Sequence, residues 1–400
     1  MNSNLYKNRL IPLYVMMLII MIMSVSCDSE SSVDQSKTGS IPNIIYDGDI
    51  GGVPCDYSTI AILLNYHKIK MINLLGMVSA QPNDYLVSVF DIFNQIHKTS
   101  VPIGAYKKYA LDDPDADYFE NTLRSVYNNG SKTNNYSGYR NKHMFEKFSN
   151  DSTKVVSQVL PSVEFYRKAL SESEDNSVII YAVGQLYNFS SFFASKTDEY
   201  SALGGLELVQ KKVKQFVFMG GYFPETGVDS KFGHEAEYNW WALGQKGITK
   251  TTIETIRTIN MPILYAGFGQ GVKVPAGTNL QTGDSDIPVS FDHPLVDAYA
   301  LNQYKTIEKA VNKEGKIVHS KAVFDESSVF YLAEANFGTQ EYNSFFSKIE
   351  GLATIRITGV NGWMDKNGTN EFRFGINGDE FEFRELISDR IKVKFSVKND

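Results

Sequence analysis

Three aspartates and three glycines lie close together after a short apolar run, in IIYDGDIGGVPCDYSTIA at residues 44–61. The aspartates are Asp47, Asp49 and Asp56, and a Gly-Gly pair separates the second from the third. Neighbouring carboxylates repel one another unless a cation or a shared proton compensates their charge. The segment therefore suits a hard divalent cation, which prefers oxygen ligands. The alternative is an unusually acidic turn, for which one or two Asp, Asn or Gly residues would be enough.

The residues around this segment alternate between β-rich runs and helical patterns. Strands are predicted at 42–47, 71–80 and 101–106, and helices at 58–69 and 83–98. Repeated strand-helix-strand units predict an α/β fold, with an open, mostly parallel sheet and helices on both faces. Such sheets bind ligands at the carboxyl ends of their strands, which is where the acidic segment lies.

Three later segments have the same design of an apolar strand followed by a glycine-containing tip. They are NSVIIYAVGQLYN, VKQFVFMGGYF and MPILYAGFGQG, at residues 176–188, 213–223 and 261–271. Four strand ends are therefore expected at one crevice. After about residue 351, alternating polar and apolar residues around Asn-Gly turns predict a C-terminal β-hairpin extension.

Composition excludes some classes of protein. The chain has 400 residues, of which 42% are hydrophobic, so it can bury a large core. Its net charge is -7 and its basic residues are scattered among acids, so no nucleic-acid partner is expected. The two cysteines are too few for a disulfide framework.

Residues 1–26 have the order of a secretory signal. A basic start precedes an apolar run at residues 11–23, which is shorter than a membrane-spanning helix, and small residues lead to Cys27. The segment resembles a bacterial lipoprotein signal, in which Cys27 would be lipidated; an ordinary cleaved signal and an uncleaved anchor are the alternatives. Polar residues at 27–40 predict a disordered tether before a domain at 41–400. We therefore expect an exported protein in the cell envelope, held to the membrane by a lipid.

Several segments together resemble the inosine-uridine preferring nucleoside hydrolase family, in particular its envelope-associated, lipoprotein-like branch. The segments are IIYDGDIGGVPCDYSTIAILL, NSVIIYAVGQLYNFSSFF, VKQFVFMGGYFPE, HEAEYNWWA, MPILYAGF and DHPLVDAYAL. The resemblance covers about residues 42–340. It implies one open α/β sheet around a calcium ion and hydrolysis of the N-glycosidic bond of ribonucleosides. The implied partner is a small nucleoside or riboside, and a homo-oligomer is compatible with it.

In this resemblance the acidic segment supplies the cation ligands and the base. Asp49 matches the aspartate that binds calcium and activates the attacking water, and Asp56 matches a second calcium ligand. A carboxylate that touches both cation and water can accept the water's proton. Asp47 would shape the site through hydrogen bonds, or would only satisfy loop amides. Val183 matches a position whose backbone carbonyl helps to hold calcium.

The positions expected at the sugar depart in part from the family pattern. Glu237 and Asn239, in EAEYN, match residues that bind ribose hydroxyls, and the alternative for them is a solvated helix start. Cys55 stands where the family has the first aspartate of an adjacent pair, which holds ribose hydroxyls. A thiol is a weak donor and acceptor, so this contact would be lost or transferred to another group. The sequence places no base near Cys55 that would make it a nucleophile.

SFDHPLVDAYAL resembles a family motif in which an aspartate is the last calcium ligand and a histidine lies beside the leaving base. The two residues are inverted here. Asp292 is therefore expected to reach the metal after a small backbone shift, because calcium prefers oxygen. His293 is a candidate acid for the leaving group, or else a residue at the start of a helix. Asp297 is expected on a helix surface.

Two functions from different classes follow from these residues. The first is a calcium-dependent hydrolase of N-glycosidic bonds in ribonucleosides or related ribosides, with Asp49 as the base. The alternative is a catalytically impaired, lipid-anchored protein that keeps the fold and captures a nucleoside or sugar without turnover. The altered position at Cys55 favours this alternative. It is also compatible with hydrolysis of a different glycosidic substrate.

Overall fold

The described part of the chain begins just before the first predicted strand. The computed structural model describes residues 40–106, 136–223, 237–241, 247–271, 275–276, 293–303, 321–322, 324–334 and 346–376. The predicted signal and tether, Cys27 and Asp292 lie outside these residues. Within them, no helix combines the length and apolar character needed to cross a membrane.

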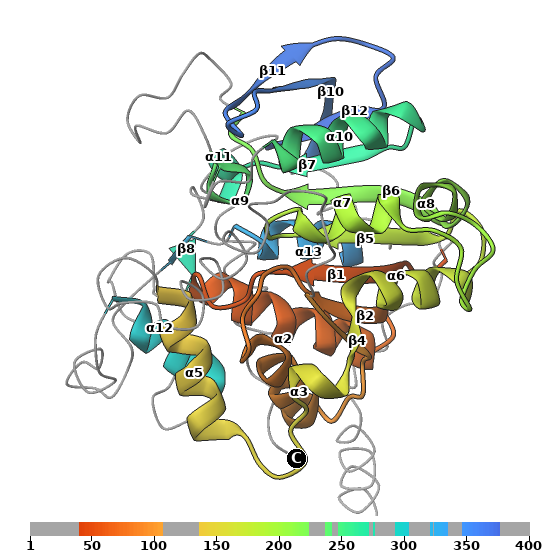
Figure 1. The fold of residues 1–400 in the computed structure, drawn as a ribbon. Coiled ribbons are helices and arrows are strands. Elements are labelled where there is room, and N and C mark those ends of the chain that lie inside the picture. The colour runs from red at the N-terminus through yellow and green to blue at the C-terminus, as the bar shows by residue number, and fades with distance from the viewer. Residues whose placement is uncertain are drawn as a thin grey trace, which may run out of the picture. The chain divides into compact units, whose positions relative to one another are not determined.

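A ten-stranded sheet connects most of these segments, in the order β11-β10-β12-β7-β6-β5-β1-β2-β3-β4 (Figure 1). Its strands are β1 (Asn43–Gly48), β2 (Asn73–Ser79), β3 (Ile103–Ala105), β4 (Leu160–Pro161), β5 (Val178–Ala182), β6 (Val213–Met219), β7 (Ile263–Ala266), β10 (Phe346–Ile355), β11 (Asn361–Asp365) and β12 (Glu371–Ile376). From β12 to β4 every neighbouring pair is parallel, whereas β10 pairs antiparallel with both β11 and β12. The predicted, mostly parallel α/β sheet is confirmed.

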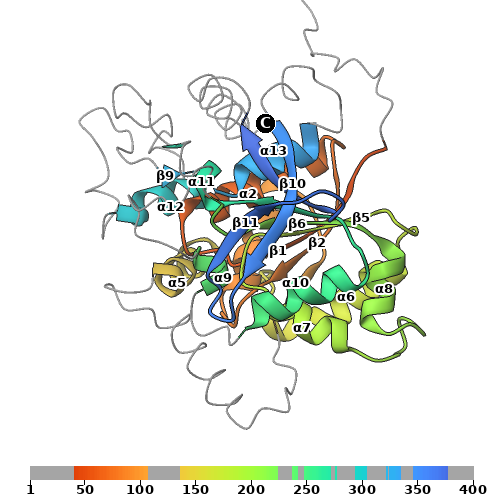
Figure 2. The same ribbon diagram turned by 90° about the horizontal axis from the view of Figure 1, so that it is seen from above.

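Helices cover both faces of the sheet, as predicted (Figure 2). On one side lie α2 (Pro54–Lys68), α3 (Leu86–His97), α5 (Tyr136–Phe148), α12 (Pro294–Gln303) and α13 (Glu326–Glu334). On the other lie α6 (Ser162–Ser171), α7 (Tyr187–Ala194), α8 (Gly205–Lys212) and α10 (Ile248–Thr258). Shorter elements are η1 (Val156–Gln158), α9 (Tyr238–Trp241), α11 (Phe268–Gly271) and the pair β8 (Pro275–Ala276) and β9 (Lys321–Ala322).

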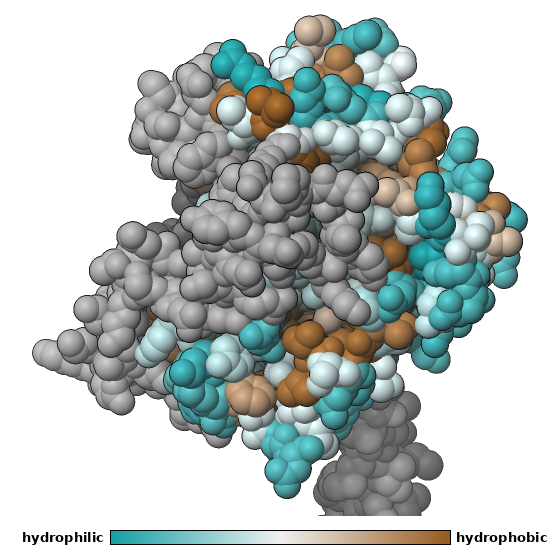
Figure 3. All heavy atoms as spheres, in the orientation of Figure 1, coloured by the Kyte–Doolittle hydropathy of each residue, from teal (hydrophilic) through white to brown (hydrophobic). Residues whose placement is uncertain are grey.

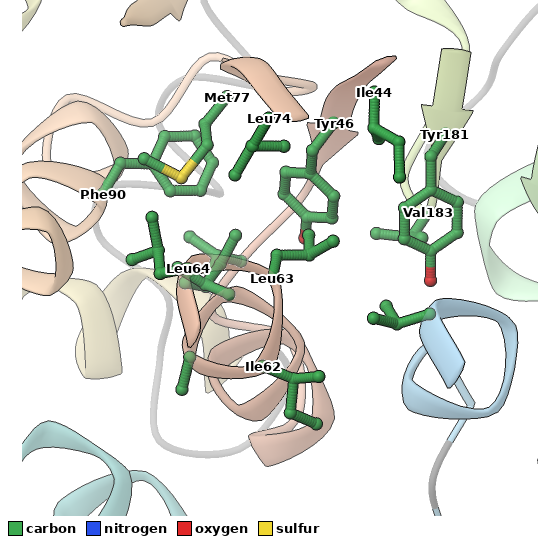
Figure 4. Close-up of a cluster of buried hydrophobic side chains, with 14 of the residues drawn as sticks. Ile44, Tyr46, Ile62, Leu63, Leu64, Leu74, Met77, Phe90, Tyr181 and Val183 are labelled. Atoms are coloured by element: carbon green, nitrogen blue, oxygen red, sulfur yellow. The ribbon is translucent and has the colours of Figure 1, made fainter. Parts of the chain in front are cut away.

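Alternate residues of each central strand pack into opposite cores. In β1, Ile44 and Tyr46 join the core beneath α2, whereas Ile45 joins the core beneath α6 and α7. Figure 4 shows the first core, in which Tyr46 and Met77 face the helices from β1 and β2. Because both faces are buried, these strands are apolar at successive positions instead of alternating with polar ones.

Helix α2 is buried along most of its length, which explains why its sequence is apolar on several sides. Pro54 occupies its first turn, where a missing backbone N–H costs little. The helix packs against the sheet and contacts α3, α12 and α13. It therefore fixes the residues of the acidic segment from within the core.

The C-terminal hairpin is confirmed and extends the main sheet. Strands β10 and β11 form the hairpin, and β12 then inserts between β10 and β7. The face in Figure 3 shows small hydrophobic areas among hydrophilic residues. The most exposed large apolar side chains of the described residues are spread over several elements: Ile41, Ile69, Tyr139, Tyr238, Ile357 and Met364. Singly exposed apolar residues are normal and define no docking surface.

Candidate active site

The loop after β1 is held by two residues of α5. Gly51 has a φ of 118°, a conformation that favours glycine. Arg140 donates from Nε to the Gly51 carbonyl at 3.0 Å and from a terminal nitrogen to the Gly52 carbonyl. Asn141 Nδ2 donates to the carbonyl of Ile50 at 2.7 Å. Both α5 side chains are buried, so the loop is fixed by contacts from a distant part of the chain.

We expect Arg140→Ala to lower the free energy of unfolding by about 2–4 kcal/mol, because it leaves the carbonyls of Gly51 and Gly52 without this donor and opens a cavity. Urea unfolding measures this loss. Lys142→Ala, on the same helix with a half-exposed side chain, is the matched control and should change stability by less than about 0.5 kcal/mol. Equal effects of the two variants would show that the loop does not depend on Arg140.

Asp56 lies in the first turn of α2 and closes the loop from the other side. Its Oδ2 accepts the backbone amides of Gly51 at 3.0 Å and Val53 at 3.1 Å. Its Oδ1 lies 3.7 Å from the sulfur of Cys55, which is also buried. One carboxylate oxygen of Asp56 thus serves the loop, and the other faces the interior of the site.

Asp325 and Glu326, at the start of α13, are two further acids beside Asp56. Asp325 lies within hydrogen-bond reach of Asp56, and its Oδ2 has no donor among the described residues. Glu326 is fully buried and accepts a hydrogen bond from the hydroxyl of Ser58 in α2. Tyr181 of β5 donates its hydroxyl to the Asp325 carbonyl at 2.7 Å and points toward this helix in Figure 4. Both acids are therefore fixed by contacts to α2 and the sheet.

Burial is the main cause of the electrostatics of this cluster. Burial and the charge of Asp56 raise the pKa of Asp49 well above its usual range, although Gln185 donates to Asp49 Oδ2 at 2.9 Å. Burial also raises the pKa of Asp56, against its amide bonds and the nearby guanidinium of Arg140. The pKa of Asp325 is raised well above its usual range by burial and then by Asp56. Such a cluster is stabilised when a cation or protons compensate its charge.

Asp47 is held by hydrogen bonds at the end of β1. Its Oδ2 accepts from the hydroxyl of Tyr166 at 2.7 Å and from Asn188 Nδ2 at 2.8 Å. Burial raises the pKa of Asp47 to about 7. Because Asn188 also donates to the carbonyl of Ser79, Asp47 belongs to a network that joins β1, β2, α6 and α7. These partners are side chains and not loop amides, and the role of Asp47 in shaping the site stays a prediction.

Glu237 and Asn239 are buried at the strand ends and not solvated. Asn239 Nδ2 donates to the carbonyl of Val183 at 2.7 Å, and Glu237 Oε2 accepts the amide of Gly221 at 3.2 Å. The charge of Glu237 contributes to the raised pKa of Asp49, so the two carboxylates lie near each other. Burial raises the pKa of Glu237 itself to about 7. The solvated helix start considered from the sequence is therefore wrong.

No family model matches the sequence, and no curated protein matches it. Solved structures do. A plant nucleoside hydrolase superposes with a TM-score of 0.55 at 13% identity, over 90% of this chain and 100% of that one. The type III effector XopQ, solved in complex with adenosine diphosphate ribose, gives 0.54 at 11% identity, over 89% and 95%. An inosine-guanosine nucleoside hydrolase gives 0.51 at 14% identity, over 89% and 98%.

The fold is that of nucleoside hydrolases. At these identities the likeness concerns the fold alone. Within the nucleoside hydrolase-like fold, most of the predicted site residues meet at the carboxyl ends of β1, β5 and β6: Asp47, Asp49, Cys55, Asp56, Val183, Glu237 and Asn239. The predicted acids of the described residues therefore gather at the strand ends where the sequence places them.

His293 lies apart from these carboxylates in the nucleoside hydrolase-like fold. Its Nδ1 accepts the amide of Leu295 at 3.1 Å, at the start of α12. Its ring packs against the rings of Phe93 and His97 in α3, with centroids 6.0 and 6.3 Å away. Burial lowers the pKa of His293 to about 4. These contacts match the helix-start alternative and give no support to a role as acid for the leaving group.

The prediction that Asp297 lies on a helix surface is wrong. Asp297 is 1% exposed and bonds to His143 Nε2 at 2.6 Å and Lys147 Nζ at 3.0 Å. The reason is that α5 packs against α12 and covers this side of the helix. Lys147 compensates the charge of the buried carboxylate, and His143 adds a further hydrogen-bond contact to it.

Sequence reasoning missed several residues of the site. Arg140 and Asn141 gave no local signal, because their partners are backbone carbonyls about 90 residues away. Asp325, in contrast, did have a local signal in the sequence. FDESSVFYLAE, at residues 324–334, begins with Phe-Asp and continues into an apolar helix, as FDHPLVDAYAL does. Either segment alone fits the expected last cation ligand.

Proposed function

We propose that this protein is a calcium-dependent hydrolase of the N-glycosidic bond in ribonucleosides or related N-ribosides. The observation that carries the proposal is the cluster of Asp49, Asp56 and Asp325, buried together at the strand ends of a nucleoside hydrolase-like fold. Three converging carboxylates are costly to bury without a cation. An acidic turn would leave its carboxylates to solvent, so this alternative does not fit the burial.

The residues present suit a calcium ion. Asp49, Asp56 and Asp325 would hold it, and the carbonyl of Val183 would be the backbone ligand predicted from the sequence. Asp325 Oδ2 is buried and has no donor among the described residues, which is the state expected of a ligand oxygen. When bound, calcium polarises a water and favours its attack on the sugar. This assigns to Asp325 the place expected for Asp292.

Side chains of this protein would position the attacking water and the sugar. Gln185 fixes Asp49 by donating to Oδ2, which leaves Oδ1 to take the proton of the attacking water. Glu237, held by the amides of Gly221 and Asn239, would accept a hydroxyl of the sugar. Positive charge develops on the sugar ring as the bond breaks, and the surrounding carboxylates stabilise it.

Capture without turnover is the second candidate, and Cys55 is the observation that favours it. The thiol lies 3.7 Å from Asp56 in place of a carboxylate that the family resemblance assigns to the ribose hydroxyls. Loss of one such contact costs about 2–4 kcal/mol of transition-state binding, or about 30- to 1000-fold in rate.

On either proposal, the sequence supports export and a lipid anchor at Cys27.

Ribose release from a panel of nucleosides separates the two functions. We expect slow release by the calcium-loaded wild type and at least about 10-fold faster release by Cys55→Asp, which restores a hydroxyl acceptor. Cys55→Asn has the same shape without the charge and is the matched control. Saturable nucleoside binding without release by the wild type or Cys55→Asp would instead favour the capture protein.

A further inference from the structure

Cys55, Asp56 and Asp325 bring a sulfur and two carboxylates to one buried point. The sulfur and one oxygen from each acid lie within 4.8 Å of one another. All three residues are at most 3% exposed. The two acids come from the starts of different helices, α2 and α13, and Cys55 directly precedes Asp56 in α2. The group is therefore assembled by tertiary packing and not by a single turn.

Asp325 supplies an independent sign that this point receives a ligand. Its carboxylate supplies an oxygen to the group and lies within hydrogen-bond reach of Asp56, and its buried Oδ2 has no donor among the described residues. A buried carboxylate oxygen without a donor is costly, and such atoms are rare unless they bind something. Glu326, whose Oε2 also has no donor among the described residues, follows Asp325 and bonds through Oε1 to Ser58, one turn from Cys55. A fourth oxygen source thus lies beside the group.

A sulfur ligand changes which cation the group prefers. Calcium takes six to eight oxygen ligands, whereas zinc and similar borderline ions take four ligands and accept thiolate, carboxylate and imidazole. Around a tetrahedral zinc, sulfur and oxygen ligands lie roughly 3.5 Å apart, given bonds of about 2.3 and 2.0 Å. The distance of 3.7 Å between Cys55 Sγ and Asp56 Oδ1 matches this spacing.

We propose that Cys55, Asp56 and Asp325 bind a thiophilic divalent cation of the zinc class. As the Sγ–metal bond forms, the thiol releases its proton to the buffer. The ion shares Asp56 and Asp325 with calcium but not Asp49, so the two ions exclude each other. This competition rests on the proposed function, whereas the thiolate site itself does not. A zinc-class ion is then an inhibitor of the calcium-dependent reaction.

Cobalt titration of the full chain tests the site without using activity. A thiolate bound to Co²⁺ gives a charge-transfer absorption in the near ultraviolet, which an all-oxygen site lacks. We expect this band in the wild type and its loss on adding Zn²⁺ or excess Ca²⁺. Cys55→Ser should abolish the band. Cys27→Ser, which alters the only other cysteine, and Asp49→Asn, which alters a residue outside the group, should keep it.

The outcomes separate this inference from the proposed function. Absence of the band in the folded wild type, or its persistence in Cys55→Ser, would overturn the thiophilic site, whatever calcium does. A band that zinc removes but calcium does not would support the thiophilic site and overturn its competition with calcium. Thermal unfolding in calcium without cobalt tests the calcium site separately. Circular dichroism shows whether Cys55→Ser is folded, and Cys55→Ala provides a second variant without sulfur.

Discussion

Asp49→Asn is expected to lower ribose release from nucleosides by at least about 100-fold, because an amide cannot accept the proton of the attacking water. The substitution should be tolerated by the fold. Gln185 donates to Asp49 Oδ2, and the carbonyl oxygen of asparagine can accept the same hydrogen bond. The measurement is the rate of ribose release at saturating nucleoside and calcium, with thermal unfolding to compare stability.

Asp175→Asn is the matched control for this prediction. It makes the same chemical change at an exposed acid that pairs with Lys212, away from the strand ends that carry the site. Its rate should remain within about twofold of the wild type. Unchanged release by Asp49→Asn would show that another group is the base and would remove Asp49 from the mechanism.

Asp325→Asn is expected to remove most of the stabilisation by calcium. A ligand at 100 times its dissociation constant stabilises the folded state by about 2.7 kcal/mol, and loss of one ligand carboxylate weakens the binding that produces this effect. In chelator, the effect of Asp325→Asn on stability is expected to have the opposite sign. The variant should then be as stable as the wild type or more stable, because it removes the unfavourable interaction with Asp56 that raises the pKa of the buried Asp325 carboxyl. Thermal unfolding in calcium and in chelator measures both effects.

Asp292→Asn distinguishes the two helix starts that resemble the family motif. If Asp325 is the cation ligand, Asp292→Asn should keep the full response to calcium. Loss of the response in Asp292→Asn but not in Asp325→Asn would return the ligand to the position expected from the sequence. Loss in neither variant, with a response in the wild type, would place calcium elsewhere in the protein.

The position of Cys55 connects the enzymatic and the metal questions. Its replacement of a carboxylate weakens the expected contact to the sugar, and the same thiol faces two acids that suit a cation. We therefore expect a low rate of nucleoside hydrolysis from a chain with Cys55, and Cys55→Asp tests this expectation directly. Because the variant adds a buried acid, it should also depend more strongly on calcium for stability than Cys55→Asn does.

The sequence alone determined the features that depend on local pattern. Apolar runs and helical periodicity placed β1, β2, β3, β5, β6 and β7 and the helices α2 and α3, because burial on both faces of the sheet leaves a continuous apolar signal. The parallel direction of the strands followed from the strand-helix-strand repetition. The acidic segment was expected at the carboxyl end of β1 because it directly follows that strand. The acidic segment could be singled out for this reason before any contact was known, and the family resemblance then matched Asp49 and Asp56 to cation ligands.

The tertiary structure decided everything that depends on which distant segments pack together. Two helix starts fit the last cation ligand equally well by sequence, and the packing of α13 against α2 brings Asp325 beside Asp56. Burial of Asp297 likewise depends on α5 crossing α12, and the fixed loop depends on Arg140. These contacts join residues about 90 to 270 positions apart, and their energy comes from burial and hydrogen bonds that no local pattern encodes.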